Sequence, residues 1–260
     1  MRGPPLGIAA PAIAAGLALS CAVPAAAQNL QSLPIPSQRW SFQGPFGTFD
    51  LASAQRGYAV YSQACASCHS MRQVTFRDLS GLGLDDDAIH NIAAGQPVPG
   101  GTDATGNTVL RPATPDDHFR LPYPNDAAGR TANNGVLPPD VSRLAMTIQG
   151  GASFIQAYLT GFRDAPPNVA LAAGMHYNDY VPGNSVAMPD PLRDGQVKYA
   201  DGTKATKAQM AHDVTTYLAW SAQPHLEDRR RLGVRVVIYL LLLLGLVFVV
   251  KCKVWADVRS

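Results

Sequence analysis

The stretch Cys65-Ala66-Ser67-Cys68-His69 decides how this sequence is interpreted. Two thiols one helical turn apart reach the two vinyl groups of one haem, and the adjacent imidazole is then placed under the iron as an axial ligand. A zinc site would need a fourth ligand, and a thioredoxin-like redox pair would need a βαβ setting and no following histidine. The motif therefore predicts one haem c, bound covalently by Cys65 and Cys68, with His69 as an iron ligand.

The N-terminal segment has the pattern of a secretory signal. Residues 1–27 carry Arg2, then an apolar run to about Ser20, and end on small residues that suit cleavage after Ala27. We expect this signal peptide to be removed together with Cys21, so that the mature chain starts near residue 28. An uncleaved anchor and a lipid anchor on Cys21 are the weaker alternatives.

The C-terminal segment is apolar enough to cross a membrane. An unbroken apolar run extends from Val236 to Val250, and with the residues before it the segment approaches the length that spans a bilayer. An ordinary core helix would keep a polar face, which this run lacks. We expect a membrane anchor over 229–250, with its basic junction, and a cytoplasmic tail over 251–260 that contains Cys252. The haem domain, 28–228, would then lie on the periplasmic side of a bacterial inner membrane.

Composition and charge limit the classes of function. Hydrophobic residues make up 47% and charged residues 15% of the chain, with 23 glycines and 21 prolines, which indicates one loop-rich domain and excludes collagen, coiled-coil and disordered classes. Between residues 28 and 228, 18 acidic residues outnumber 13 basic ones. An acidic domain disfavours nucleic acid and steers basic proteins toward itself. The run Asp85-Asp86-Asp87 is the candidate docking site, or else a solvated loop or helix start.

Several residues compete for the second axial position on the iron. A methionine opposite the histidine raises the reduction potential. Three methionines are set aside because they lie too near His69 or on expected packing faces: Met71, Met146 and Met210. Met175 and Met188 remain, and Met188 is preferred because it lies in the irregular, proline-containing segment 182–192. A bis-histidine site would instead use His90, His118, His176, His212 or His225.

Local patterns predict a mostly helical fold. A short helix is expected before the haem motif, where Ala54, Tyr58 and Tyr61 share one face. Thr206-Lys207-Ala208-Gln209 has the pattern of a capping box, and predicts a helix that runs to about Ser221. A further helix containing 154–158 should end at Gly161. The segment 95–130 is predicted to be loop, and no strand of useful length is expected.

Taken together, these segments resemble the cytochrome c1 family, the haem subunit of the bc1-type quinol:cytochrome c oxidoreductase. The resemblance covers nearly all of the mature chain. The matching residues are Trp40-Ser41-Phe42, the haem motif, Pro122-Tyr123-Pro124-Asn125, Ala132-Asn133-Asn134-Gly135, Leu137-Pro138-Pro139-Asp140, Leu159-Thr160-Gly161-Phe162, Tyr177-Asn178, the Met188 segment, Asp201-Gly202-Thr203, Asp213-Val214, Trp220 and the C-terminal apolar run.

The resemblance implies more than the residues alone show. It implies a haem domain like class I c-type cytochromes, with long loop insertions and one C-terminal transmembrane helix, and Met188 as the sixth iron ligand. It also implies a one-electron carrier of a respiratory or photosynthetic bc1 complex, passing electrons from the Rieske iron-sulfur subunit to a soluble basic c-type cytochrome, beside cytochrome b. In that family a basic residue soon after Pro-Pro-Asp contacts a haem propionate; here Arg143 is the only cation at that place, and Arg120 is a second candidate.

Two other functions fit the same motif. The chain could be a free-standing, membrane-tethered cytochrome, or the haem subunit of a terminal oxidase. A flexible spacer before the anchor would favour the first of these. The segment 220–235 is instead short and charged, without Gly/Ser repeats, which favours a rigid junction within a complex.

Overall fold

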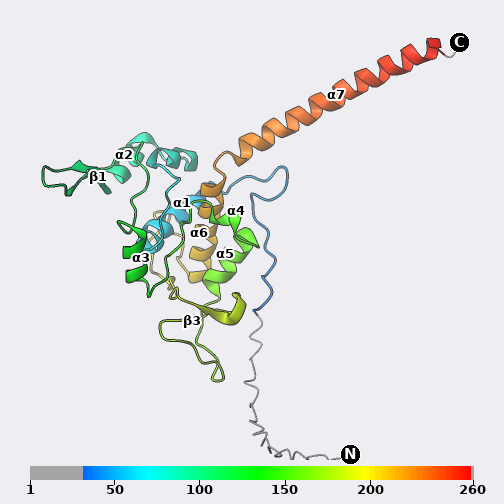
Figure 1. Ribbon diagram of the computed structural model, residues 1–260. Helices are drawn as coiled ribbons and strands as arrows, with labels where there is room; N and C mark the ends of the chain where they lie inside the picture. The colour runs from blue at the N-terminus through cyan, green and yellow to red at the C-terminus, as the bar shows by residue number, and fades with distance from the viewer. Residues whose placement is uncertain (1–31, 259–260) are drawn as a thin grey trace, which may run out of the picture.

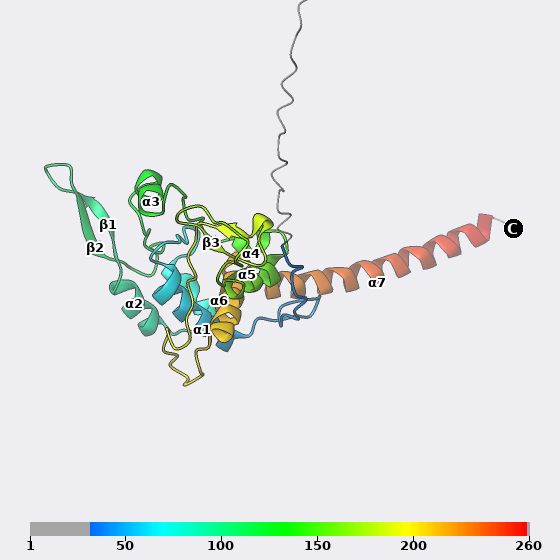
Figure 2. The same ribbon diagram turned by 90° about the horizontal axis from the view of Figure 1, so that it is seen from below.

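The computed structural model describes residues 32–258. The expected signal peptide, with Cys21 and the cleavage site, lies outside the described residues, as do the last two residues of the tail. A body of helices and long connections makes up most of the chain, and one long helix, α7, projects away from it in both views (Figures 1 and 2).

Helices are the main regular structure. In chain order the α-helices are α1 (Leu51–Val60), α2 (Asp86–Ala94), α3 (Asp126–Ala132), α4 (Leu144–Thr147), α5 (Gly151–Thr160), α6 (Lys207–Ala222) and α7 (Leu226–Val258). A π-helical turn, Tyr61–Cys65, continues α1, and two 3₁₀ helices cover Phe76–Leu82 and Pro182–Asn184. Two antiparallel pairs of strands complete the structure: β1 (Pro97–Thr102) with β2 (Thr108–Pro112), and β3 (His176–Tyr177) with β4 (Ser185–Val186).

The core is organised around α6, which packs against α1, α4 and α5. Most of α6 is buried, including Met210, Val214 and Tyr217. The closest approach is to α1 at Gly57, where an added Cβ would overlap the carbonyl oxygen of Asp213 and lie 2.7 Å from Tyr217 Cβ. Because α1 leads directly into the haem motif, this crossing positions the motif against the centre of the core.

A buried carboxylate ties α1 to α6 at the same crossing. Asp213 is fully buried and accepts hydrogen bonds from Ser53 Oγ (2.7 Å), Arg56 Nε (3.0 Å) and Gln209 Nε2 (3.1 Å). The hydrogen bond to Asp213 is the main cause that raises the pKa of Arg56. Arg56 also pairs with Asp201 at 2.9 Å, so the 201–203 turn is attached to the same network. A buried charge is tolerated when it is paired and hydrogen-bonded in this way.

The helices predicted to end at Gly161 and to begin after Thr206 are confirmed as α5 and α6. Thr206 is the N-cap of α6, where its Oγ1 accepts from Gln209 N at 3.2 Å. The Gln209 side chain does not return to the cap but bonds to Asp213, so only half of the expected capping box forms. Helix α5 ends at Thr160 with Gly161 as its C-cap, as the sequence predicts.

The prediction of an unbroken loop over 95–130 is wrong. Strands β1 and β2 form a hairpin with a register shift between Pro99 and Gly101, and helix α3 begins at Asp126. Nearly every hairpin residue is exposed, so no apolar alternation marks the strands. Backbone pairing rather than burial builds this hairpin, and for that reason the hydrophobic pattern gave no sign of it.

Three residues separate the end of α6 from the start of α7. Gln223 N donates to Trp220 O at 2.9 Å, and Leu226 N donates to Gln223 O at 3.0 Å, so the connection is short and hydrogen-bonded. Leu226–Ala256 is long and apolar enough to cross a membrane, and the apolar part is exposed throughout. The helix continues beyond the expected anchor, through Val258.

Candidate haem-binding site

Cys65 ends the wider, π-helical turn that continues α1, and Cys68 lies in the turn that follows it. Ala66 N donates to Tyr61 O at 2.8 Å, and both Cys68 N and His69 N donate to Cys65 O, at 3.0 and 2.9 Å. Both cysteines are free and partly exposed. Desolvation raises the pKa of Cys65 to about 12, so this thiol is neutral at physiological pH. The two cysteines therefore offer thiols from neighbouring turns to one ligand.

A hydrogen bond to the main chain orients the His69 ring. His69 Nδ1 lies 3.0 Å from the carbonyl oxygen of Pro139. Because a carbonyl can only accept, Nδ1 carries the proton and Nε2 keeps its lone pair for a metal. Burial is the main cause that lowers the pKa of His69. The imidazole is therefore neutral near pH 7, which is the form that binds iron.

Asp140, the residue after Pro139, hydrogen-bonds to the segment that follows the haem motif, and so holds the Pro139 carbonyl next to His69. Its carboxylate accepts from Ser70 Oγ (2.8 Å), Arg72 N (2.9 Å) and Ser142 N (3.0 Å). Burial by itself raises the pKa of Asp140, but these hydrogen bonds outweigh burial and hold the pKa below its ordinary value. Val141 N also donates to Ser70 O at 2.9 Å. The Pro-Pro-Asp segment is thus hydrogen-bonded both to the His69 ring and to residues 70–72 that follow it; we call this set of hydrogen bonds the clamp.

We expect Asp140→Ala to destabilise the domain and loosen His69. Loss of three hydrogen bonds to a carboxylate costs about 3 kcal/mol. Because the fold lowers the pKa of Asp140, its contribution is present above the ordinary aspartate pKa of about 4 and is lost as pH falls through the folded value. Thermal unfolding at pH 7 and at lower pH measures both effects: the wild-type melting temperature falls on acidification, and the fall is smaller in the variant, where other carboxylates with a lowered pKa, such as Asp117, remain.

The control for this prediction is Asp103→Ala. Asp103 Oδ1 also accepts three hydrogen bonds, from Thr105 N, Thr105 Oγ1 and Asn107 N, but at the exposed β1–β2 turn. We expect Asp103→Ala to leave the haem absorption spectrum unchanged and Asp140→Ala to alter it. Equal spectra for the two variants would contradict the clamp.

Met188 lies in an irregular segment that packs against the core and is held on α5. Tyr158 Oη on α5 donates to Met188 Sδ at 3.6 Å. Burial raises the pKa of Tyr158 to about 12, so the hydroxyl remains a donor throughout the physiological range. Met188 packs against the same core cluster as Cys65. The thioether is therefore held in one place by a hydrogen bond and by packing.

Two buried asparagines fix the course of this segment. Asn178 Nδ2 donates to Tyr158 O at 2.8 Å, and Asn184 Nδ2 donates to Asn178 O at 2.9 Å. Both side chains are almost completely buried, and Asn184 adopts a left-handed conformation (φ 51°) that asparagine tolerates better than most residues. The segment before Met188 is thereby attached to the same helix that carries Tyr158.

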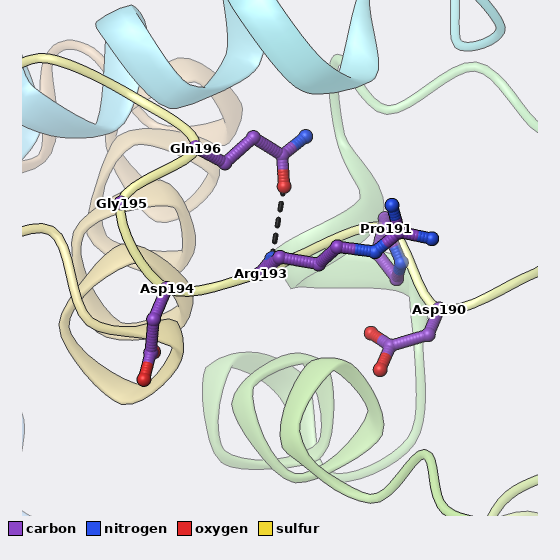
Figure 3. Close-up of a pocket in the computed structure, with 6 residues that line it drawn as sticks. All are labelled: Asp190, Pro191, Arg193, Asp194, Gly195 and Gln196. Carbon is purple, nitrogen blue, oxygen red and sulfur yellow. Dashed lines mark hydrogen bonds between the residues drawn. The ribbon is translucent and has the colours of Figure 1, made fainter.

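The segment after Met188 is attached to the start of α6. Asp190 Oδ2 accepts from Lys207 Nζ at 2.6 Å, and Asp194 Oδ1 accepts from Lys207 N at 2.6 Å. Figure 3 shows the loop from Asp190 to Gln196, in which Gln196 Oε1 accepts from Arg193 N at 2.9 Å. The residues drawn line a hollow that contains no aromatic or sulfur-containing side chain. We therefore do not assign this hollow to haem binding.

The structure places the rival axial ligands in other settings. Met71 and Met210 are fully buried, and Tyr217 Oη donates to Met71 Sδ at 3.2 Å. Met146, which the sequence assigned to packing, is 45% exposed. Met175 is half-buried but does not join the core cluster. Four of the histidines are exposed, namely His90, His118, His176 and His225, whereas His212 stacks on Trp40 at 5.0 Å.

The candidate propionate ligands and the candidate docking residues are charged and exposed. Arg143 precedes α4, Arg120 precedes the Pro-Tyr-Pro-Asn segment, and neither side chain has an ion pair within residues 32–258. Asp85 is the N-cap of α2, where its Oδ1 accepts from Ala88 N at 2.8 Å, and Asp86 and Asp87 lie in the first turn. Asp85 therefore has a structural role, which leaves Asp86 and Asp87 as the acidic pair available to a partner.

The donor set fits a haem. It combines two free thiols on adjacent turns, an imidazole with a free Nε2, and a thioether, which together match covalent attachment and His/Met ligation. Within the described part of the chain, no group of three or more histidine, cysteine, aspartate or glutamate side chains could hold a metal ion. A structural zinc site, the alternative that sequence spacing raised, therefore has no ligand set in these residues.

Reasoning from sequence missed the residues that support the ligands. Pro139, Asp140, Tyr158, Asn178 and Asn184 were named only as markers of a resemblance or as helix residues, without a role. Apart from Asn184, whose bond to Asn178 is local, they act through hydrogen bonds across 20 to 70 positions of the sequence, which no local pattern reveals. The one available signal was the presence of polar residues in loops otherwise rich in proline and glycine.

Comparison with known proteins gives one consistent family. The model of the Cytochrome C1 family matches residues 40–258. The chain is 39% identical to the cytochrome c1 of Rhodospirillum rubrum, over 95% of this chain and 96% of that protein. It is 44% identical to the mitochondrial cytochrome c1 haem protein of Saccharomyces cerevisiae, over 88% and 74%. It also matches cytochrome b/c1 of Bradyrhizobium diazoefficiens at 39% identity, over 94% of this chain and 39% of that longer protein. The chain therefore belongs to the cytochrome c1 family.

Proposed function

We propose that the chain carries single electrons from a Rieske iron-sulfur protein to a soluble, basic c-type cytochrome. Membership of the cytochrome c1 family makes it a haem electron-transfer subunit of a bc1 complex that also contains cytochrome b. The chain itself is the electron carrier, and catalysis belongs to the quinol:cytochrome c oxidoreductase as a whole. The observation that best supports the proposal is the contact between His69 Nδ1 and Pro139 O, which leaves Nε2 for the iron.

The protein residues do three things in this mechanism. Cys65 and Cys68 attach one haem c, whose iron, when bound, accepts and releases one electron. His69 is held by Pro139, and Met188 is held by Tyr158 and the core. Both side chains are fixed by contacts within the protein that do not depend on the charge of a bound iron. Together they would hold the haem iron, and a thioether ligand beside the imidazole would keep its reduction potential high.

The placement in the membrane follows from the two ends of the chain. A cleaved signal over 1–27 exports the haem domain, and α7 then crosses a bacterial inner membrane once, with the tail in the cytoplasm. The basic residues before the apolar run remain on the periplasmic side, because a long translocated domain follows its signal rather than local charge. The motif after the first helix, the α1–α6 crossing and the long connections support a class I-like haem domain enlarged by insertions.

The acidic pair on α2 supports docking of a basic acceptor. We expect Asp86→Asn/Asp87→Asn to slow the reduction of a basic soluble cytochrome by up to about tenfold at low ionic strength, with the difference vanishing at high salt. Asp85 is kept because it caps α2. Stopped-flow rates as a function of salt measure the effect. Asp164→Asn/Asp228→Asn removes the same charge elsewhere, and equal slopes for the two double variants would remove this role from α2.

Co-purification separates the proposal from the other two functions. Extraction in mild detergent should yield the chain together with a b-type cytochrome and an iron-sulfur protein. The short, hydrogen-bonded connection between α6 and α7 favours this outcome, because a free-standing carrier needs a spacer that lets its haem domain move. Isolation of the chain alone, or with an oxygen-reducing partner, would refute the proposal.

A further inference from the structure

A groove lies where the haem domain meets α7. It has a volume of about 350 Å³ between residues 45–48 and the first turns of the helix. The helix lines it with residues at positions i, i+3, i+4, i+7 and i+8, which form a single face. These residues are Glu227, Arg230, Arg231, Val234 and Arg235.

The groove carries an excess of positive charge. Glu227 is its one acidic residue, and Glu227 Oε1 is already engaged by Phe49 N at 2.9 Å. Arg231 Nη2 approaches Glu227 Oε2 only to 3.8 Å, and Arg235 has no ion pair among residues 32–258. Arg231 and Arg235 are themselves four residues apart, a spacing at which like charges repel on a helix. An anion between them would relieve this repulsion.

One arginine is already ordered. Arg230 is half-buried, and its Nη1 donates to Gly47 O at 2.7 Å. A guanidinium has five N–H donors, so Arg230 keeps donors for a ligand while its position is fixed by the haem domain. At the same edge, Phe46 is 81% exposed. The groove therefore combines an oriented cation, two exposed cations and an exposed aromatic ring.

The apolar helix next to the groove indicates the kind of anion. The run Val236–Val250 follows Arg235 directly, and its large apolar side chains are 42% to 66% exposed. This step rests on the proposed membrane anchoring: if the run lies in hydrocarbon, the arginines lie at the depth of the lipid phosphates. We propose that the groove binds the phosphate group of an anionic phospholipid, whose chains lie along the exposed apolar face of α7.

Lipid binding to the full chain tests this proposal. The haem-containing protein, delipidated in detergent, is titrated with phosphatidylglycerol or phosphatidylcholine and observed by native mass spectrometry. We expect tighter binding of phosphatidylglycerol, and a loss of about fivefold in its affinity for each arginine removed, hence about 25-fold for Arg231→Gln/Arg235→Gln. Arg230 is not replaced, because it also bonds to the haem domain.

Lys251→Gln/Lys253→Gln is the matched control, since it removes the same charge from the other end of α7. We expect this variant to bind phosphatidylglycerol as the wild type does. Wild-type affinity in the arginine variant, equal losses in both variants, or displacement of the lipid by millimolar inorganic phosphate would each overturn the proposal. Alkaline carbonate extraction tests the membrane anchor separately from lipid binding in the groove. Release of the wild-type chain from membranes would refute the anchor. If the chain is retained, a negative lipid titration refutes only the binding of lipid in the groove.

Discussion

Replacement of Met188 by leucine is expected to lower the reduction potential of the haem by several tenths of a volt while the haem stays attached. The thioether is the ligand that raises the potential, and axial ligands as a group shift haem potentials over about 0.8 V. Leucine keeps the size and apolar character of the side chain, so the core contacts are preserved. Spectroelectrochemical titration of the purified variant measures the shift, and a pyridine haemochrome assay shows that the haem remains.

Met175→Leu is the control for this result. Met175 is half-buried like Met188, but among residues 32–258 its thioether accepts no hydrogen bond and it does not join the core cluster. We expect its potential to equal that of the wild type. The reverse pattern, an unchanged potential in Met188→Leu and a lowered one in Met175→Leu, would transfer the axial role to Met175. Unchanged potentials in both would point to a histidine.

Substitution of Gly57 by alanine should prevent stable folding of the haem domain. The added Cβ would overlap the carbonyl oxygen of Asp213 and crowd Tyr217 Cβ, and backbone cannot yield as a flexible side chain can. We expect a loss of more than about 4 kcal/mol, which is a large share of a domain's stability. Because α1 continues into the Cys65 turn, the yield of haem-loaded protein should fall with it.

Gly95→Ala provides the comparison for Gly57→Ala. Gly95 is the C-cap of α2 with a φ of −72°, and a Cβ there would meet its nearest neighbours at 3.6 Å, an ordinary contact. Thermal unfolding and the haem-to-protein ratio are measured for both variants. Near-wild-type behaviour is expected for Gly95→Ala alone. Equal stability of the two variants would show that α1 and α6 do not need this close crossing.

Local patterns predicted the parts of the fold that depend on neighbours in sequence. The N-cap at Thr206, the end of α5 at Gly161 and the apolar length of α7 all follow from residues within a few positions of one another. The β1–β2 hairpin was missed because its strands are exposed and irregular. Hydrophobic alternation marks a strand only when one face is buried.

In the candidate site, too, sequence predicted the residues that are neighbours in the chain and missed those that act from a distance. The attachment residues Cys65, Cys68 and His69 are contiguous, so a motif identifies them. The supports come from far along the chain: Pro139 orients His69, and Tyr158 holds Met188 across 30 positions. Likewise, sequence could not show that Asp85 caps α2. Because this residue is engaged, the docking proposal rests on Asp86 and Asp87.

The proposed function depends on one haem that is bound through Cys65 and Cys68, with His69 and Met188 on the iron. The most direct measurement is the haem content of the mature protein, made in a host that matures c-type cytochromes and extracted with acid acetone. We predict one haem per chain, retained after extraction and lost to the solvent in Cys65→Ala/Cys68→Ala. A colourless wild-type protein, or haem that the solvent removes, would contradict the account.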